Sequence, residues 1–168
     1  MIKTLKYLFM TLVVVALTSC DKEDIGETAT VSLAGEWMVT VDLVDASGNV
    51  IAEDPYGLGV MQIITYNTAA NVPTEMWLSD LSNFWDFTVK VPCDAAAQTF
   101  GASSPLQNTS YDCTVTITDG KVVYGGTVSP SGAKADAISF LVEFSDDDPG
   151  MKYLMHGYRR TGLNGGAE

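Results

Sequence analysis

The chain has 168 residues, with 21 acidic and nine basic side chains and a formal net charge of −12. Such an acidic surface repels phosphate backbones, so the composition excludes a nucleic-acid partner. The length fits one domain that can bury a hydrophobic core of its own.

The N-terminal segment has the parts of an export signal. Lys3 and Lys6 precede an apolar stretch over residues 7–16, and the run LTSC follows it and ends at Cys20. A basic region, a short apolar region and small residues make up a secretory signal peptide, and the stretch is shorter than the about 20 apolar residues of a membrane span. A cysteine at the cleavage point resembles a bacterial lipoprotein signal. We therefore expect residues 1–19 to be removed and Cys20 to carry acyl chains that attach the protein to a membrane.

Residues 20–32 are expected to form an acidic tether between this anchor and the folded domain. The run Asp21-Lys22-Glu23-Asp24 resembles the surface-export signal of Bacteroidetes lipoproteins, in which a lysine and acidic residues follow the lipidated cysteine. This predicts an outer-membrane lipoprotein exposed at the cell surface, with attachment facing the periplasm as the alternative. Without residues 1–19 the formal charge is −14, which disfavours membrane contact other than through the acyl chains.

The expected folded domain covers residues 33–162 and is followed by a tail at 163–168. Apolar and polar residues alternate with a period of two through most of it, which is typical of half-buried strands. Asp119-Gly120 separates two such runs and predicts a hairpin, and Pro92 is expected to end the run that begins at Trp85. The predicted strands cover residues 37–43, 58–67, 76–78, 85–91, 111–118, 121–128, 138–144 and 153–161, with one further short strand near Thr99-Phe100.

About eight short strands with regular turn signals indicate an all-β fold. The simplest topology is an antiparallel up-and-down meander that closes into a barrel, and a β-sandwich is the alternative. Cys93 and Cys113 lie at predicted strand ends, where an exported compartment permits a disulfide; two separate buried thiols are the alternative. Two cysteines cannot form a tetrahedral cluster alone, and the sequence predicts no metal site and no cofactor.

Two motifs at opposite ends of the domain carry a family resemblance. Gly35-Glu36-Trp37 opens the first predicted strand, and Arg159 and Arg160 lie in the last one. This resembles the pattern of lipocalins and other calycins, in which an arginine packs across the tryptophan and closes the base of the barrel; the sequence leaves open which arginine faces Trp37. With the lipoprotein signal, the chain resembles the lipocalin-like lipoproteins of Bacteroidetes, including a family labelled lipid-binding putative hydrolase. The resemblance covers residues 33–162.

Aromatic residues on the predicted strands are the candidates for ligand binding, because they could line an apolar cavity, although they could equally fill the barrel. They are Trp77, Trp85, Phe87, Tyr111, Tyr124, Phe140 and Tyr153. The leading hypothesis is a lipid-anchored binding module that holds a small hydrophobic, lipid-like ligand inside the barrel. A surface accessory or glycan-binding lipoprotein, with Trp77 and Trp85 stacking on sugar rings, is the alternative.

A hydrolase is the second alternative. His156 is the only histidine, and no G-x-S-x-G nucleophile turn is present. No catalytic residue is therefore assigned, and no protein partner is predicted.

Overall fold

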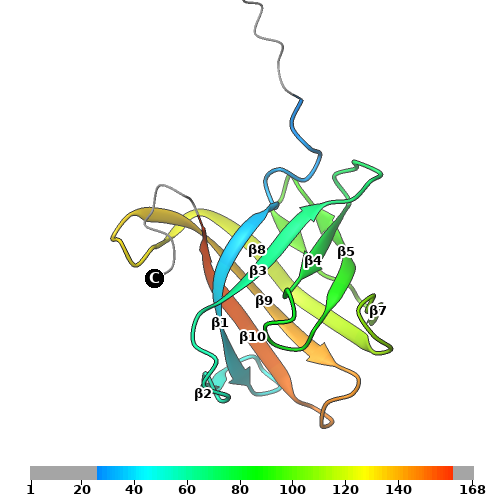
Figure 1. The fold of residues 1–168 in the computed structure, drawn as a ribbon, viewed down its shortest axis with the longest axis vertical. Helices are drawn as coiled ribbons and strands as arrows, with labels where there is room; N and C mark the ends of the chain where they lie inside the picture. The colour runs from blue at the N-terminus through cyan, green and yellow to red at the C-terminus, as the bar shows by residue number, and fades with distance from the viewer. Residues whose placement is uncertain (1–25, 161–168) are drawn as a thin grey trace, which may run out of the picture.

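A computed structural model describes residues 26–160, so the predicted signal peptide, Cys20 and the tail at 163–168 lie outside the described residues. The described chain is all β, as predicted. It forms a closed antiparallel barrel of eight strands with two short strands added to it (Figure 1). The strands are β1 (Gly35–Val44), β2 (Val50–Glu53), β3 (Met61–Asn67), β4 (Glu75–Ser79), β5 (Thr88–Asp94), β6 (Thr99–Phe100), β7 (Leu106–Gln107), β8 (Thr114–Val128), β9 (Lys134–Phe144) and β10 (Lys152–Arg159).

The barrel is an up-and-down meander. Its strands follow one another as β1, β3, β4, β5, β6, β8, β9 and β10, and β10 pairs with β1 to close the ring. That closing ladder runs from Trp37 opposite Arg159 to Val44 opposite Lys152. β2 is added to β1 and β7 to β8. The prediction of a closed meander is confirmed, and the sandwich alternative is excluded because the hydrogen-bonded ring is continuous.

Side chains at alternate positions of the strands point inward and fill the interior of the barrel. In β1, Trp37, Val39 and Val41 point inward, and all three are buried. Each neighbouring strand adds its own inward positions, such as Ile63 in β3 and Val142 in β9, and these side chains form one hydrophobic cluster. The strands therefore enclose a packed core.

The hairpin predicted at Asp119-Gly120 is wrong. These residues lie within one continuous strand, β8, and the register of β8 against β9 shifts between Thr118 and Lys121. Asp119 has a φ of 54°, the left-handed backbone that Asp-Gly supplies to a bulge as readily as to a tight turn. The two predicted strands are therefore one long strand with a bulge.

Pro92 does not end its strand either, because β5 continues to Asp94. The carbonyl of Pro92 accepts a hydrogen bond from the amide of Gly101, on the side where the short β6 pairs with β5. Pro92 lies just beyond the end of the β5–β6 ladder, so its missing N–H removes at most one hydrogen bond to the neighbouring segment and β5 can continue.

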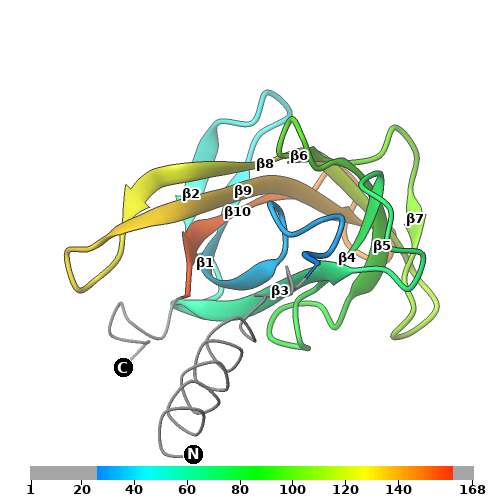
Figure 2. The ribbon, with the colours of Figure 1, turned by 90° about the horizontal axis from the view of Figure 1, so that it is seen from above.

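The barrel has two distinct ends (Figures 1 and 2). At the closed end β1 begins and β10 finishes, and residues 26–34 lie across it, with Leu33 and Thr30 fully buried. We call the opposite end the mouth. It is formed by the connections 45–49, 54–60, 80–87, 108–113 and 145–151.

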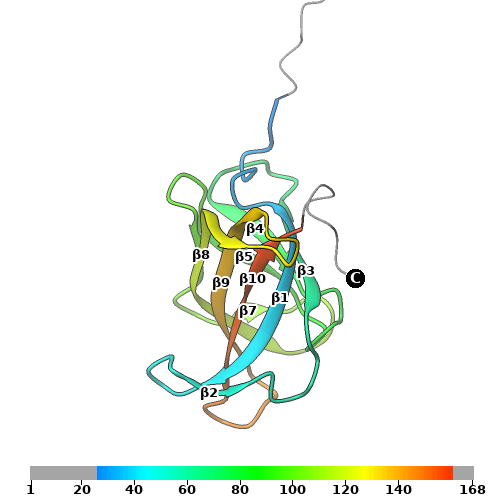
Figure 3. The same ribbon diagram turned by 90° about the vertical axis from the view of Figure 1, so that its left-hand side faces the viewer.

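The side view in Figure 3 shows β1 crossing from one end of the barrel to the other. Residues 26–160 contain no helix with the length and apolar composition needed to cross a membrane.

Candidate functional site

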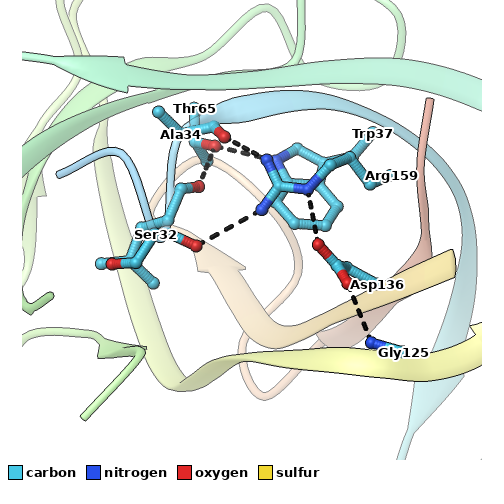
Figure 4. Close-up of polar contacts among 8 residues, drawn as sticks. Ser32, Ala34, Trp37, Thr65, Gly125, Asp136 and Arg159 are labelled. Carbon is cyan, nitrogen blue, oxygen red and sulfur yellow. Dashed lines mark hydrogen bonds and ion pairs between the residues drawn. The ribbon is translucent and has the colours of Figure 1, made fainter. Parts of the chain in front are cut away.

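An arginine and a tryptophan seal the closed end of the barrel (Figure 4). The guanidinium carbon of Arg159 lies 4.2 Å from the centroid of the Trp37 ring, a contact that contributes about 0.5–2 kcal/mol. Arg160 points outward and pairs with Glu36, at 2.7 Å between Nη1 and Oε2. Of the two arginines that the sequence left open, Arg159 is therefore the one that covers Trp37.

Hydrogen bonds fix both side chains of this seal. Arg159 donates from Nε to Asp136 Oδ2 at 3.0 Å, and its two terminal nitrogens donate to the carbonyls of Ala34 and Ser32. Trp37 donates from Nε1 to the hydroxyl of Thr65 at 2.8 Å. Because every side-chain nitrogen of Arg159 and Trp37 is paired inside the protein, we assign this end to stability rather than to ligand binding.

Gly35 is required for the same seal. A Cβ atom at this position would collide with the guanidinium of Arg159. The glycine of the Gly-x-Trp motif therefore allows the arginine to cross the first strand beside the tryptophan.

A cluster of aromatic rings fills the mouth. We call it the mouth cluster; it consists of Tyr56, Phe84, Trp85, Phe87, Phe144 and Tyr153. Trp85 stacks on Phe144 with 4.7 Å between centroids and 11° between planes, and Phe84 meets Tyr153 edge to face at 5.1 Å. Such offset-stacked and edge-to-face pairs contribute about 0.5–1.5 kcal/mol each beyond their burial.

Part of this cluster faces solvent. Tyr56 is 50% exposed, and its hydroxyl lies 2.7 Å from the hydroxyl of the buried Tyr153. Leu58, Val60 and Leu81 add exposed apolar side chains to the mouth loops 54–60 and 80–87. Exposed apolar side chains and the ring of Tyr56 are therefore accessible on the loops at this end of the barrel.

The loop 80–87 carries Phe84 and Trp85, and the Asp80 carboxylate holds it in shape. Asp80 is fully buried. Its Oδ1 accepts the amides of residues 82 and 87, at 3.0 and 2.9 Å, and its Oδ2 accepts those of residues 84, 85 and 86, at 2.8–3.0 Å. The positions of Phe84 and Trp85 in the mouth thus depend on one charged side chain.

Two further carboxylates bind the polar edges of the rings. Asp146 accepts hydrogen bonds from Trp85 Nε1 at 3.1 Å and from the Tyr111 hydroxyl at 2.7 Å, and Asp147 accepts one from the Tyr153 hydroxyl at 2.7 Å. The Tyr111 bond holds the pKa of Asp146 below its usual value. Burial raises the pKa of Tyr111 and of Tyr153 above the usual range of a phenol. At neutral pH Asp146 is therefore an ionised carboxylate, and Tyr111 and Tyr153 are neutral phenols.

Five of the seven aromatic residues singled out from the sequence lie in the core or at the mouth. Phe87, Phe140 and Tyr153 are fully buried, and Phe140 packs against another interior ring, Phe100, at 5.6 Å. Trp85 is half-buried and Tyr111 is partly exposed. The buried three are packed core side chains.

The other two lie away from both groups. Trp77 alternates with the buried Met76 and Leu78 of β4, so it faces outward, where it stacks on Tyr66 of β3 at 6.3 Å. Tyr124 is 57% exposed on the far part of β8. The seven residues therefore do not form one site.

Sequence reasoning missed several mouth residues, above all Tyr56, Phe84 and Asp80. Tyr56 follows a proline and precedes a glycine, and the run from Asp80 to Phe87 reads DLSNFWDF. Aromatic residues within turn-forming segments were the available signal, because loops carry binding residues more often than strands do.

Cys93 and Cys113 are free thiols, so the disulfide considered from the sequence is wrong and the alternative of separate thiols describes the structure. The Cys113 sulfur accepts a hydrogen bond from Asn108 Nδ2 at 3.4 Å, whereas that of Cys93 lies 3.5 Å from the carbonyl of Pro73. Cys93 also lines a groove of about 620 Å³ between β5, β6 and β8, to which none of the seven aromatic candidates contributes.

His156 lies on the outer wall of the barrel. Its Nε2 is 2.9 Å from Asp42 Oδ2 and 3.3 Å from the Thr40 hydroxyl. A nucleophile–histidine–carboxylate relay uses a different ring nitrogen for each partner, whereas here both contacts share one. Among the described residues no group of three or more histidine, cysteine, aspartate or glutamate side chains is arranged to hold a metal ion.

The fold and the closed end define the class of protein: an eight-stranded meander barrel with a Gly-x-Trp first strand covered by an arginine of the last strand. The sequence model of the lipid-binding putative hydrolase family matches residues 22–164. This match spans most of the chain, so the chain belongs to that family. No curated protein matches the sequence. The family and the barrel together support lipid binding as the function.

Proposed function

We propose that this protein is a lipid-anchored binding module that takes up a small hydrophobic, lipid-like ligand at the mouth of its barrel. The observation that carries the proposal is the mouth cluster, in which Tyr56 is 50% exposed, Phe84 and Trp85 are half-buried, and the other three rings are buried beneath them. The closed end is sealed by Arg159 and Trp37, and the interior is packed, so a ligand enters from the mouth.

We propose the mouth as the site, rather than the barrel interior expected from the sequence, because the interior is packed with side chains. An apolar chain that lies along Tyr56, Leu58 and Leu81 covers side chains that are each 41–50% exposed. Burying that surface yields about 25 cal/mol per Å².

The position of the proposed anchor in the sequence favours an orientation in which the mouth of the barrel faces away from the membrane. The described chain begins at Gly26, and the segment before β1 leads into the closed end (Figure 1). Residues 20–25 connect it to the cysteine that we propose is acylated, and six extended residues reach about 20 Å. β1 alone has ten residues, which span about 33 Å. A short tether at the closed end therefore favours capture of ligand from outside the anchoring membrane, consistent with the proposed surface-exposed position in an outer membrane.

Binding is tested with a neutral fluorescent probe, N-phenyl-1-naphthylamine, on residues 26–168. Trp85→Ala removes a ring of the mouth cluster and is expected to weaken probe binding about tenfold, or about 1.4 kcal/mol. Trp77→Ala is the matched control, since this ring lies on the outer wall; its affinity stays within about twofold of wild type. Equal loss in both variants, or no probe binding by the wild type, refutes the proposed site.

The anchor is tested in the full chain. Metabolic labelling with an alkyne fatty acid should tag the wild type and not Cys20→Ala, and the variant should leave the membrane fraction. A Cys20→Ala protein that stays labelled and membrane-bound contradicts lipidation at this residue. Digestion of intact cells with protease then separates surface exposure, in which the protein is lost, from attachment facing the periplasm, in which it survives.

A further inference from the structure

Acidic side chains are concentrated at one end of the barrel. The five mouth connections hold eight aspartates and no lysine, arginine or histidine. At the closed end, the segments 26–34, 68–74, 95–98 and 129–133 hold a single acidic residue, Glu27, and no basic one. Among the connections of the described barrel, the acidic side chains are therefore concentrated at the mouth, the end that carries the mouth cluster.

Few positive charges compensate it. Lys152, at the start of β10, is the basic residue closest in sequence to the mouth turn 145–151, and its Nζ is bound to Glu143 Oε1 at 2.9 Å. Seven of the eight mouth aspartates are partly or fully exposed, and Asp80 alone is buried. A ligand at the mouth therefore meets a negative potential, which a low-dielectric apolar surface strengthens.

The rings and the carboxylates belong to one arrangement. Asp146 binds the polar edges of Trp85 and Tyr111, and Asp147 binds the hydroxyl of Tyr153, which in turn meets Tyr56. The carboxylates thus hold the edges of rings whose faces carry the negative end of the aromatic quadrupole. Rings of this kind with nearby anions attract organic cations.

A metal ion fits this end poorly. The exposed aspartates are spread over five connections, and no three acidic, histidine or cysteine groups within residues 26–160 converge at metal-binding spacing. A diffuse negative field over an apolar surface suits a large, weakly hydrated cation attached to an apolar chain.

We infer that the ligand of this mouth is an amphiphile with a cationic head, an amine or a quaternary ammonium, rather than a fatty acid or another anionic lipid. This inference rests on the proposed function, because it assigns a ligand class to the same site. The apolar chain contacts the mouth cluster and the exposed apolar side chains of the loops. The head lies among the aspartates, with Asp146 and Asp147 closest to the rings.

The test compares three compounds of twelve carbons, dodecyltrimethylammonium, dodecanol and dodecanoate, the two ionic ones below their micelle concentrations and dodecanol below its solubility limit. Each displaces bound N-phenyl-1-naphthylamine from residues 26–168. The cation is expected to bind about tenfold more tightly than dodecanoate, with dodecanol between them. The difference should shrink between about 20 mM and about 300 mM NaCl, because salt screens exposed charges.

Two charge-matched double variants separate the mouth from the net charge of the protein. Asp112→Asn with Asp148→Asn neutralises two mouth carboxylates whose side chains make no hydrogen bond in the described structure. It should reduce the preference for the cation about threefold or more. Glu27→Gln with Asp119→Asn changes the net charge equally but away from the mouth, and it should leave the preference unchanged.

The outcomes distinguish this inference from the proposed function. Equal affinity for the three compounds, or tightest binding of dodecanoate, overturns the cationic ligand while leaving a hydrophobic site at the mouth. A preference that falls equally in both double variants also overturns it, because the field of the whole protein would then explain the result. Failure of the neutral probe to bind, or its undiminished binding to Trp85→Ala, removes the proposed function and this inference with it.

Discussion

Replacing Asp80 by asparagine should open the mouth while leaving the barrel closed. The carboxylate is fully buried and accepts five backbone amides from its own loop. Asparagine has nearly the same shape, but it keeps only one accepting oxygen and turns the other position into a donor. The substitution therefore changes the hydrogen bonds of the loop with little change in packing volume.

The size of the effect follows from how the five bonds divide between the two oxygens. If the amide oxygen of the introduced asparagine takes the place of Oδ2, the bonds from residues 82 and 87 are lost; if it takes the place of Oδ1, those from residues 84, 85 and 86 are lost. Hydrogen bonds to a charged group contribute about 1.5–3 kcal/mol each, so losing two of them costs about 3 kcal/mol or more. The new amide group also faces backbone donors, which adds to the loss.

Two measurements check this prediction. Urea unfolding followed by tryptophan fluorescence should show a free energy of unfolding about 3 kcal/mol lower than wild type. Amide hydrogen exchange should show lost protection at residues 82 and 87 or at residues 84–86, according to which oxygen is replaced, while the ladder between β1 and β10 stays protected. Asp86→Asn is the control in the same loop, because its side chain is exposed. A loss below about 1 kcal/mol in Asp80→Asn, with the loop amides still protected, would refute the role given to Asp80.

Three further predictions concern the rest of the barrel. Burial, with nearby carboxylates, raises the pKa of Cys93 to about 11 from an ordinary 9.0; at pH 8 its thiolate fraction falls about 100-fold, so dithionitrobenzoate should react about 100-fold more slowly with the folded than with the unfolded chain. Burial also raises the pKa of Tyr153 above the usual 10.0, so stability is full below about pH 10 and falls as the pH rises further, and Tyr153→Phe should flatten that fall in urea titrations. Arg159→Met removes the stacking on the indole and the charged partner of Asp136, and it should cost about 2–4 kcal/mol, whereas Arg160→Met, at an exposed ion pair, should cost about 0.5 kcal/mol or less in the same assay.

The barrel could be predicted from the sequence because alternation is a local property. Side chains in a strand point alternately inward and outward, so Arg159 shares a face with Tyr153 and Met155, and the structure has all three on the inner side. The predicted number of about eight barrel strands was right, but only because two differences from the prediction cancel. The hairpin at 119–120 does not exist, which removes one strand, and the two-residue strand at 99–100 takes its place in the ring.

The mouth could not be predicted in the same way. Tyr56 and Tyr153 are 97 residues apart in sequence, and they meet because the barrel closes and brings the 54–60 loop next to the start of β10. The ring positions also depend on two loops, and loop conformation follows from backbone hydrogen bonds rather than from a hydrophobic period. The hydrogen bonds of Asp80 are the one feature of the mouth that could have been predicted from the sequence. They reach only residues 82–87, and an aspartate at the start of a serine- and asparagine-containing loop is a known signal for such local bonding.

Backbone strain gathers in the same loop that carries the rings. Leu81, Ser82 and Asp86 have φ values of 55°, 61° and 50°, in the left-handed region that a bulky residue such as leucine rarely adopts. Each costs of order 1 kcal/mol and persists only where the surroundings over-determine it, and the five bonds to Asp80 provide that constraint. A loop that served only to connect β4 to β5 could relax by placing glycine at these positions. Leucine and serine at these positions keep an apolar side chain exposed at the rim of the loop that carries Phe84 and Trp85, which agrees with the binding surface that we propose at the mouth.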